Sequence, residues 1–96
     1  MRFEWDERKN RENRRKHRIS FELAVEVFND PLCLTIPDQI VDGEERLWTL
    51  GSVGGGSIVL VVVHSIPNQG GEETIRILSA RKATPRERKF YEEDDK

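Results

Sequence analysis

The sequence predicts an α+β domain with a mainly antiparallel sheet of four to five strands, two helices before the sheet and one helix after it. Four strand-like segments follow one another between Leu32 and Lys82, and short connections of this kind favour antiparallel neighbours. Helical signals lie on either side of this run, so the helices form a separate layer against the sheet. A length of 96 residues fits one domain, which we place over residues 1–96.

The N-terminal segment predicts a short strand and a polar helix. Phe3-Glu4-Trp5 is the strand, and Asp6 is a typical helix N-cap. The helix that follows, Glu7 to His17, has no apolar stripe, so we expect it to be exposed and to gain little stability from packing. Basic residues recur at helical spacing along one side of it: Arg8, Arg11, Arg15 and Arg18.

A second helix is predicted from Phe21 to Asn29. Ser20 is its N-cap, and Asp30-Pro31 ends it because the residue before a proline avoids helical dihedral angles. Apolar residues with i, i+3, i+4, i+7 spacing predict the face that packs on the sheet: Phe21, Ala24, Val25 and Phe28.

Two strands with a turn between them are predicted next. Leu32 to Ile36 is the first strand, and a turn rich in Pro, Asp and Gly follows from Pro37 to Gly43. The second strand, Glu45 to Leu50, alternates so that one side carries Arg46, Trp48 and Leu50. Gly51 to Ser57, which follows it, is a flexible connection and not a phosphate-binding loop, because it lacks the Lys and Ser/Thr of a P-loop and no helix follows.

The last three segments are a central strand, a loop and an outer strand. The unbroken β-branched run from Ser57 to His64 predicts a central strand that is covered on both faces. Pro67 to Gly71 is a loop, and Thr74 to Lys82 alternates like a strand.

The final helix has the clearest local signal in the chain. Thr84 and Glu87 have the spacing of a capping box, and Pro85 occupies the first helical position. We expect the helix to run from Pro85 to about Glu93.

Charge is segregated along the chain, although the net charge is only −2. Met1 to Arg18 holds eight Lys or Arg against four acids, and Arg76 to Lys89 holds six against the single acid Glu87. Between these blocks, Arg46 is the only basic residue among nine acids. Two basic blocks that meet in space attract a polyanion, whereas two blocks that stay apart only solvate helix surfaces.

Cysteine and hydrophobic content exclude several classes of protein. Cys33, the only cysteine, lies between leucines and is interpreted as a small buried hydrophobe. The sequence has no disulfide framework and no zinc-ligand spacing, so we expect no metal and no cofactor. The apolar run Ile58 to Val63 is too short to cross a bilayer, and a soluble protein of the reducing cytoplasm, without a membrane partner, fits best.

Four separated blocks, in this order, make the chain similar to a known family. They are FEWDERKNRENRRKH from Phe3, FELAVEVFNDP from Phe21, GEERLWTLG from Gly43 and RILSARKATPRERKFYE from Arg76. Together they resemble the BrnT toxin family over Phe3 to Glu92, with a looser match between Gly51 and Glu73.

The resemblance implies a single BrnT-like toxin domain with a RelE-like fold. It implies a ribonuclease toxin of a type II toxin–antitoxin module, a hydrolase that cuts RNA and inhibits translation. It also implies a BrnA-type antitoxin that neutralises the toxin and represses the shared operon. The toxin would then associate with operator DNA only indirectly, through the antitoxin. Two alternatives remain: a protein that binds RNA without cutting it, and an inactive toxin that only supports its antitoxin in operon autorepression.

Metal-free RNA cleavage needs a base for the ribose 2′-OH, cations for the phosphorane and an acid for the leaving 5′-oxygen. We expect a metal-independent endoribonuclease, with phosphate contacts from Arg81 and Lys82 beside the N-terminus of the last helix. Strict strand alternation puts Arg76 and Lys82 on one face and Arg81 on the other, so a bulge or a strand end before Arg81 is needed to bring all three into one cleft. The candidate catalytic set is Arg46, His64, Arg76, Arg81 and Lys82.

Each further candidate has a structural alternative. Arg46 is interpreted as catalytic or as an ion-pair partner of Glu44 or Glu45. His64 is interpreted as base or acid, or as a buried and hydrogen-bonded strand residue. Trp5 and Trp48 are interpreted as core residues, with base stacking as the alternative.

Candidate RNA-binding residues come from both basic blocks. For His17 the alternative role is to complement the helix dipole, and for Tyr91 it is packing on the sheet. The set is Lys16, His17, Arg86, Arg88 and Tyr91.

Overall fold

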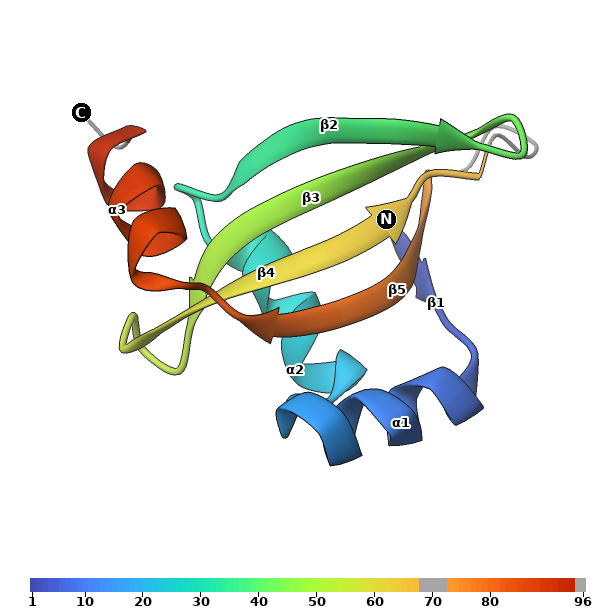
Figure 1. Cartoon of the computed structure of the whole chain (residues 1–96), viewed down its shortest axis with the longest axis horizontal. Coiled ribbons are helices and arrows are strands. Elements are labelled where there is room, and N and C mark those ends of the chain that lie inside the picture. The colour runs from blue at the N-terminus through green and yellow to red at the C-terminus, as the bar shows by residue number, and fades with distance from the viewer. Residues whose placement is uncertain (68–72, 95–96) are drawn as a thin grey trace.

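The computed structural model describes residues 1–67 and 73–94, and it contains five strands, three α-helices and one 3₁₀ helix (Figure 1). The predicted loop at Pro67–Gly71 lies almost entirely outside the described residues. In chain order the elements are β1 (Arg2–Glu4), α1 (Glu7–His17), α2 (Phe21–Val25), the 3₁₀ helix η1 (Glu26–Asn29), β2 (Leu34–Val41), β3 (Glu44–Val53), β4 (Ile58–Ser65), β5 (Thr74–Lys82) and α3 (Pro85–Asp94).

The strands form one sheet in the order β1-β5-β4-β3-β2, which confirms the α+β class. β4 is central, as its β-branched run predicts. The three pairings among β2, β3, β4 and β5 are antiparallel, but β1 pairs with β5 in parallel, so the sheet is mixed. The sequence did not indicate this pairing, because a three-residue strand carries no signal for its partner or direction. No helix in the described part of the chain is long and apolar enough to cross a membrane.

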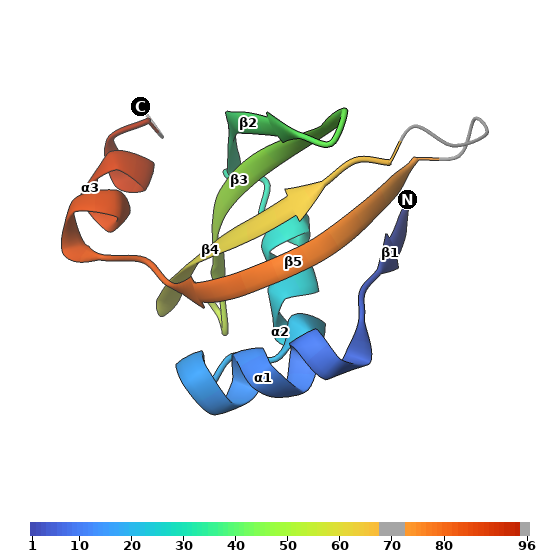
Figure 2. The same ribbon diagram turned by 45° about the vertical axis from the view of Figure 1, so that its right-hand side comes forward.

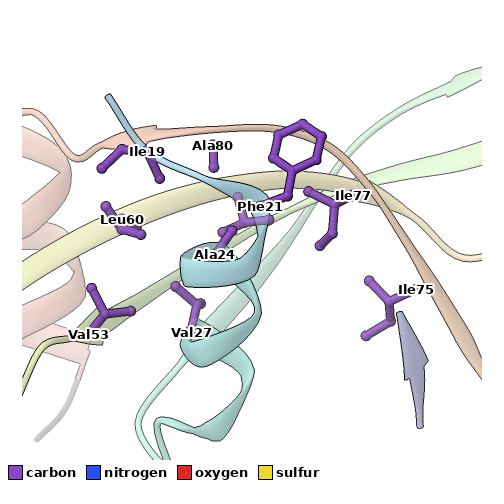
Figure 3. Close-up of a cluster of buried hydrophobic side chains, with 10 residues drawn as sticks. Ile19, Phe21, Ala24, Val27, Val53, Leu60, Ile75, Ile77 and Ala80 are labelled. Atoms are coloured by element: carbon purple, nitrogen blue, oxygen red, sulfur yellow. The ribbon is translucent and has the colours of Figure 1, made fainter. Parts of the chain in front are cut away.

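α2 and η1 pack on one face of the sheet, which we call the covered face. Figure 3 shows Phe21, Ala24 and Val27 directed at sheet residues, and all three are fully buried. Val25 and Phe28 of the predicted stripe are only partly buried. The difference follows from the change to a 3₁₀ helix at Glu26, because three residues per turn align Val27 with Ala24.

α1 is docked more firmly than its polar sequence predicts. Asn10 and Asn13 are buried, with exposed fractions of 0% and 7%. Asn13 donates to the carbonyls of Ile19 and Ala80, at 2.8 and 2.7 Å, and accepts from the Ala80 amide at 3.1 Å. Asn10 accepts from the Phe21 amide. Most of α1 is exposed, as predicted, but hydrogen bonds from two buried amides, which the sequence did not indicate, dock the helix in place of an apolar stripe.

β2 and β3 are longer than predicted. β2 continues through Pro37 with an irregular register between Pro37 and Ile40, and the chain turns at Asp42 and Gly43, both with positive φ. β3 extends to Val53, so Gly51 lies inside a strand and not in a flexible connection. A Cβ atom on Gly51 would stand 2.7 Å from Val27 Cγ1, so a bare backbone is needed there for η1 to pack.

Candidate functional site

The face of the sheet opposite α2 is only partly covered, and we call it the open face. Tyr91 of α3 packs there against Leu50, Val59 and Val61. Figure 2 shows α3 at one end of the sheet, apart from α1 and α2. The remaining open face presents Arg46, Trp48, Arg76 and Arg81, as the strand register shows.

A β-bulge in β5 places Arg76 and Arg81 on the same face. His64 pairs with Ile77, but Val63 pairs with Ser79, so Leu78 is an extra residue that reverses the alternation. Arg76 is therefore opposite Ser65, and Arg81 is opposite Val61. The bulge required for convergence of these two arginines is present.

The same bulge moves Lys82 away from the arginines. Lys82 pairs with Leu60, whose side chain belongs to the core of the covered face. Lys82 is exposed at the sheet margin, where it lines a shallow pocket of about 190 Å³ together with Arg88. The structure thus brings together Arg76 and Arg81, but not Lys82.

Arg46 and Arg76 lie in one row across the open face. Arg46 is opposite Ser65, and Ser65 is opposite Arg76, so the two backbones are two strand spacings apart, about 10 Å. Both residues line an open pocket of about 260 Å³, whose other lining residues are Lys9, Val41, Asp42, Glu44 and Leu78. Ser65 is 1% exposed, and its hydroxyl has no hydrogen-bond partner among the described residues.

The two arginines of this pocket have different charge environments. Arg76 Nε donates to Glu4 Oε2 at 2.7 Å and Nη1 lies 3.4 Å from Glu44 Oε2, contacts that raise the pKa of Arg76. The ion-pair alternative for Arg46 named Glu44 as a possible partner, but Glu44 pairs with Arg76 instead. Within residues 1–67 and 73–94, Arg46 has no ion-pair or hydrogen-bond partner for its guanidinium.

Arg81 forms a two-point ion pair with Glu87 of α3. The nitrogen–oxygen distances are 2.8 and 3.0 Å, and the hydrogen bond from Arg81 lowers the pKa of Glu87 to about 2. The predicted capping box is confirmed, because the Thr84 amide donates to Glu87 and the Glu87 amide donates to Thr84 Oγ1. Arg81 Cζ lies 5.5 Å from the centroid of the Trp48 ring, so its guanidinium is held near the middle of the open face.

Asp30 fixes α3 against the sheet. Its carboxylate accepts hydrogen bonds from the Tyr91 hydroxyl and from the amide and hydroxyl of Ser52. Burial alone would raise the pKa of Asp30, but these hydrogen bonds outweigh it and lower that pKa. Sequence reasoning gave Asp30 only the role of ending a helix, since its partner Tyr91 is 61 residues away. Tyr91 is 8% exposed and packs on the sheet, which was the alternative to an RNA contact.

His64 is buried on the covered face, away from the arginines. It is 2% exposed, its Nε2 lies 2.7 Å from Thr49 Oγ1, and its ring is 5.1 Å from the ring of Phe28. Burial lowers the pKa of His64 to about 4, so the imidazole is neutral at physiological pH. Its position is that of a buried, hydrogen-bonded strand residue, and we do not include it in the site proposed below.

The remaining RNA-binding candidates are spread over two regions. Lys16 is exposed and His17 half-buried at the C-terminal end of α1, whereas Arg86 and Arg88 are exposed on α3. Arg88 lies 3.5 Å from Glu92 on the same helix. Figures 1 and 2 both show α1 and α3 apart, so these two groups do not form one patch.

Positive charge from three arginines thus lies on one face, with carboxylates beside it. Arg46, Arg76 and Arg81 supply donors that fit phosphate oxygens, and Glu44 supplies an acceptor in the same pocket as the first two. Across the described residues, no group of three or more His, Cys, Asp or Glu could hold a metal ion. Glu44 was missed as a site residue because its position depends on a turn and a register that the sequence did not reveal.

Comparison with known proteins identifies the family. The model for the BrnT ribonuclease toxin of type II toxin–antitoxin systems matches residues 5–87 of the 96-residue chain. No curated protein matches the sequence. The matched range begins just after β1 and runs from α1 through β5 to the start of α3. It therefore contains Arg46, Arg76 and Arg81 of the open face. The chain belongs to the BrnT family, the ribonuclease toxins of type II toxin–antitoxin systems.

Proposed function

We propose that this chain cleaves RNA on its open face without a metal ion and so inhibits translation, within a RelE-like fold. The observation that carries the proposal is the placement of Arg46 of β3 and of Arg76 and Arg81 of β5 on one face of the sheet. The guanidinium groups of Arg46 and Arg76 line one pocket and can neutralise the charge that grows on a phosphorane, which is usually the largest single contribution to catalysis of this kind.

Arg46 and Arg76 are proposed to hold the scissile phosphate. Arg46 has no carboxylate partner among the described residues, so its guanidinium can take a phosphate without first losing an ion pair. Arg76 is oriented by Glu4 and Glu44. Arg81, held over Trp48, is proposed to contact the next phosphate or the developing charge.

Proton transfer is assigned to two other residues of the pocket. Glu44 is proposed to take the proton of the ribose 2′-OH as its oxygen bonds to phosphorus. The bond from phosphorus to the 5′-oxygen then breaks, and this oxygen takes a proton from Lys9, which lines the same pocket. The products are a 2′,3′-cyclic phosphate and a 5′-hydroxyl.

The test is cleavage of labelled RNA by purified protein with excess EDTA present. Wild type should yield fragments with cyclic phosphate ends, and Arg46→Ala and Arg81→Ala should each lose at least about 100-fold in rate, the range typical for removal of one charge-stabilising donor. Arg15→Ala, an exposed arginine of α1, is the matched control and should cleave normally. Cleavage abolished by EDTA would refute the metal-free route. Binding of RNA without cleavage would favour a non-catalytic RNA-binding protein.

We further propose that a BrnA-type antitoxin neutralises the chain. The family description names a toxin–antitoxin system, and such a system requires a neutralising partner. Expression without the antitoxin should arrest growth, and coexpression should restore it. Unimpaired growth of cells that produce folded wild-type protein without its partner would instead support an inactive toxin that acts only in operon autorepression.

A further inference from the structure

An apolar groove lies between α3 and the sheet, beside the arginines of the open face. Its volume is about 250 Å³, and it is lined by Ile36, Trp48, Leu50, Arg86, Glu87 and Phe90. Phe90 is 51% exposed, although it stands at the edge of this groove. A large aromatic side chain left in solvent next to an apolar groove is a common mark of a binding site.

Trp48 connects this α3 groove to the arginines. Its ring carries the Arg81 guanidinium at 5.5 Å, and it also lines the groove. Trp48 is two residues from Arg46 along β3 and on the same face, a separation of about 7 Å. A nucleotide chain with a phosphate at Arg46 therefore has the groove within reach of an adjacent base.

We propose that the α3 groove binds one unpaired nucleobase of the RNA, next to the phosphate that is cleaved. This inference rests on the RNA cleavage proposed above and names the part of the substrate that the site holds. Trp48 and Phe90 provide aromatic surfaces on which the base can stack. Arg86, which also lines the groove, provides a positive charge for the RNA backbone next to that base.

The lining favours a nucleobase over an apolar protein side chain. Single-stranded RNA presents flat aromatic rings joined by phosphates, and the groove combines two aromatic side chains with Arg86, while Arg81 lies over one of them. An aliphatic side chain needs no cations beside it.

The groove also predicts low base selectivity. Among the described residues that line it, Glu87 is the only carboxylate, and Arg81 and the Thr84 amide already occupy its oxygens. With few free polar atoms to read base edges, the groove distinguishes bases by stacking area, so purines should bind better than pyrimidines.

Phe90 variants test the assignment with a single-stranded RNA that carries 2′-O-methyl groups throughout and cannot be cleaved. Phe90→Ala should weaken binding about 5- to 150-fold in fluorescence anisotropy, the range for one base stacked on one aromatic ring. Phe90→Tyr should bind like wild type, whereas Phe90→Leu should resemble Phe90→Ala because it lacks a π-face. Leu32→Ala is the matched control, since Leu32 is 50% exposed and does not line the groove.

A second probe locates the base. One abasic site is moved through the same oligonucleotide; a single position should weaken binding to wild type, and the same abasic RNA should bind Phe90→Ala no more weakly than intact RNA does.

The outcomes separate this inference from the proposed function. Wild type that binds and cleaves RNA with Phe90→Ala unchanged would overturn the groove and leave the cleavage proposal intact. Wild type that binds no RNA would overturn both. Phe90→Leu with wild-type affinity, or Phe90→Ala that binds RNA normally but loses its antitoxin, would assign the groove to an apolar protein side chain.

Discussion

Asn13→Ala should strongly destabilise the protein, although it changes one polar residue on a helix without apolar residues. β1 pairs only with Thr74 to Arg76 at the start of β5. Further along the same strand, the Asn13 side chain forms hydrogen bonds with both the amide and the carbonyl of Ala80. It thus takes the place of a neighbouring strand one residue before Arg81. Its third hydrogen bond, to the Ile19 carbonyl, ties in the connection to α2.

The expected loss follows from the groups left without partners. Truncation at Asn13 removes three hydrogen bonds. It leaves three backbone groups without these partners: the amide and carbonyl of Ala80, which is 0% exposed, and the carbonyl of Ile19, which is 3% exposed. An unsatisfied buried group costs about 1–3 kcal/mol, so we expect a loss of about 3–5 kcal/mol in the free energy of unfolding, with some water entry at the vacated site. That is a large part of the stability of a domain of this size.

Urea unfolding followed by circular dichroism measures the change, with Asn29→Ala as the matched control on an exposed asparagine of η1. The amide of Ala80 should also exchange with solvent faster in Asn13→Ala, which links the loss to β5. A difference below about 1 kcal/mol between the two variants would refute the argument, since one lost hydrogen bond accounts for that much.

Two further predictions concern the buried side chain of His64 and the close packing at Gly51. The pKa of His64 is about 4 in the folded protein, against an ordinary value of 6.5. As pH falls, the imidazole is therefore protonated in the unfolded state before it is protonated in the folded state. Stability should therefore decrease from pH 6.5 towards pH 4, by up to about 3 kcal/mol, and His64→Gln should flatten this dependence; parallel curves for the two proteins would contradict it. Gly51→Ala should cost about 1–3 kcal/mol because the new Cβ would meet Val27 Cγ1 at 2.7 Å. The cost should shrink in a Val27→Ala background, which removes Cγ1 but keeps the Val27 carbonyl at 3.0 Å from the new Cβ. An unchanged cost in that double-mutant cycle would rule out the clash with the Val27 side chain as its cause.

Features that depend on near neighbours were predictable from the sequence. The capping box of Thr84 and Glu87 and the N-caps Asp6 and Ser20 form as expected, because their partners lie two or three residues away. The central position of β4 was predictable too, since an unbroken β-branched run suits a strand with both faces covered.

Features that depend on register and on distant partners were not predictable. The parallel pairing of β1, the docking of α1 through Asn13 and the ion pair of Arg76 with Glu44 join residues that are far apart in the chain. Each is decided by how strands and helices are placed, not by local residue preference.

The candidate site shows both cases. Residue types and charge segregation in the sequence indicated arginines as the candidate phosphate ligands, because guanidinium groups suit phosphate. Which of them share a face was decided only by the tertiary structure, through one extra residue in β5 at Leu78. Side chains alternate with a period of two, so a single inserted residue transfers every later side chain to the other face, and this brought Arg81 beside Trp48 and removed Lys82.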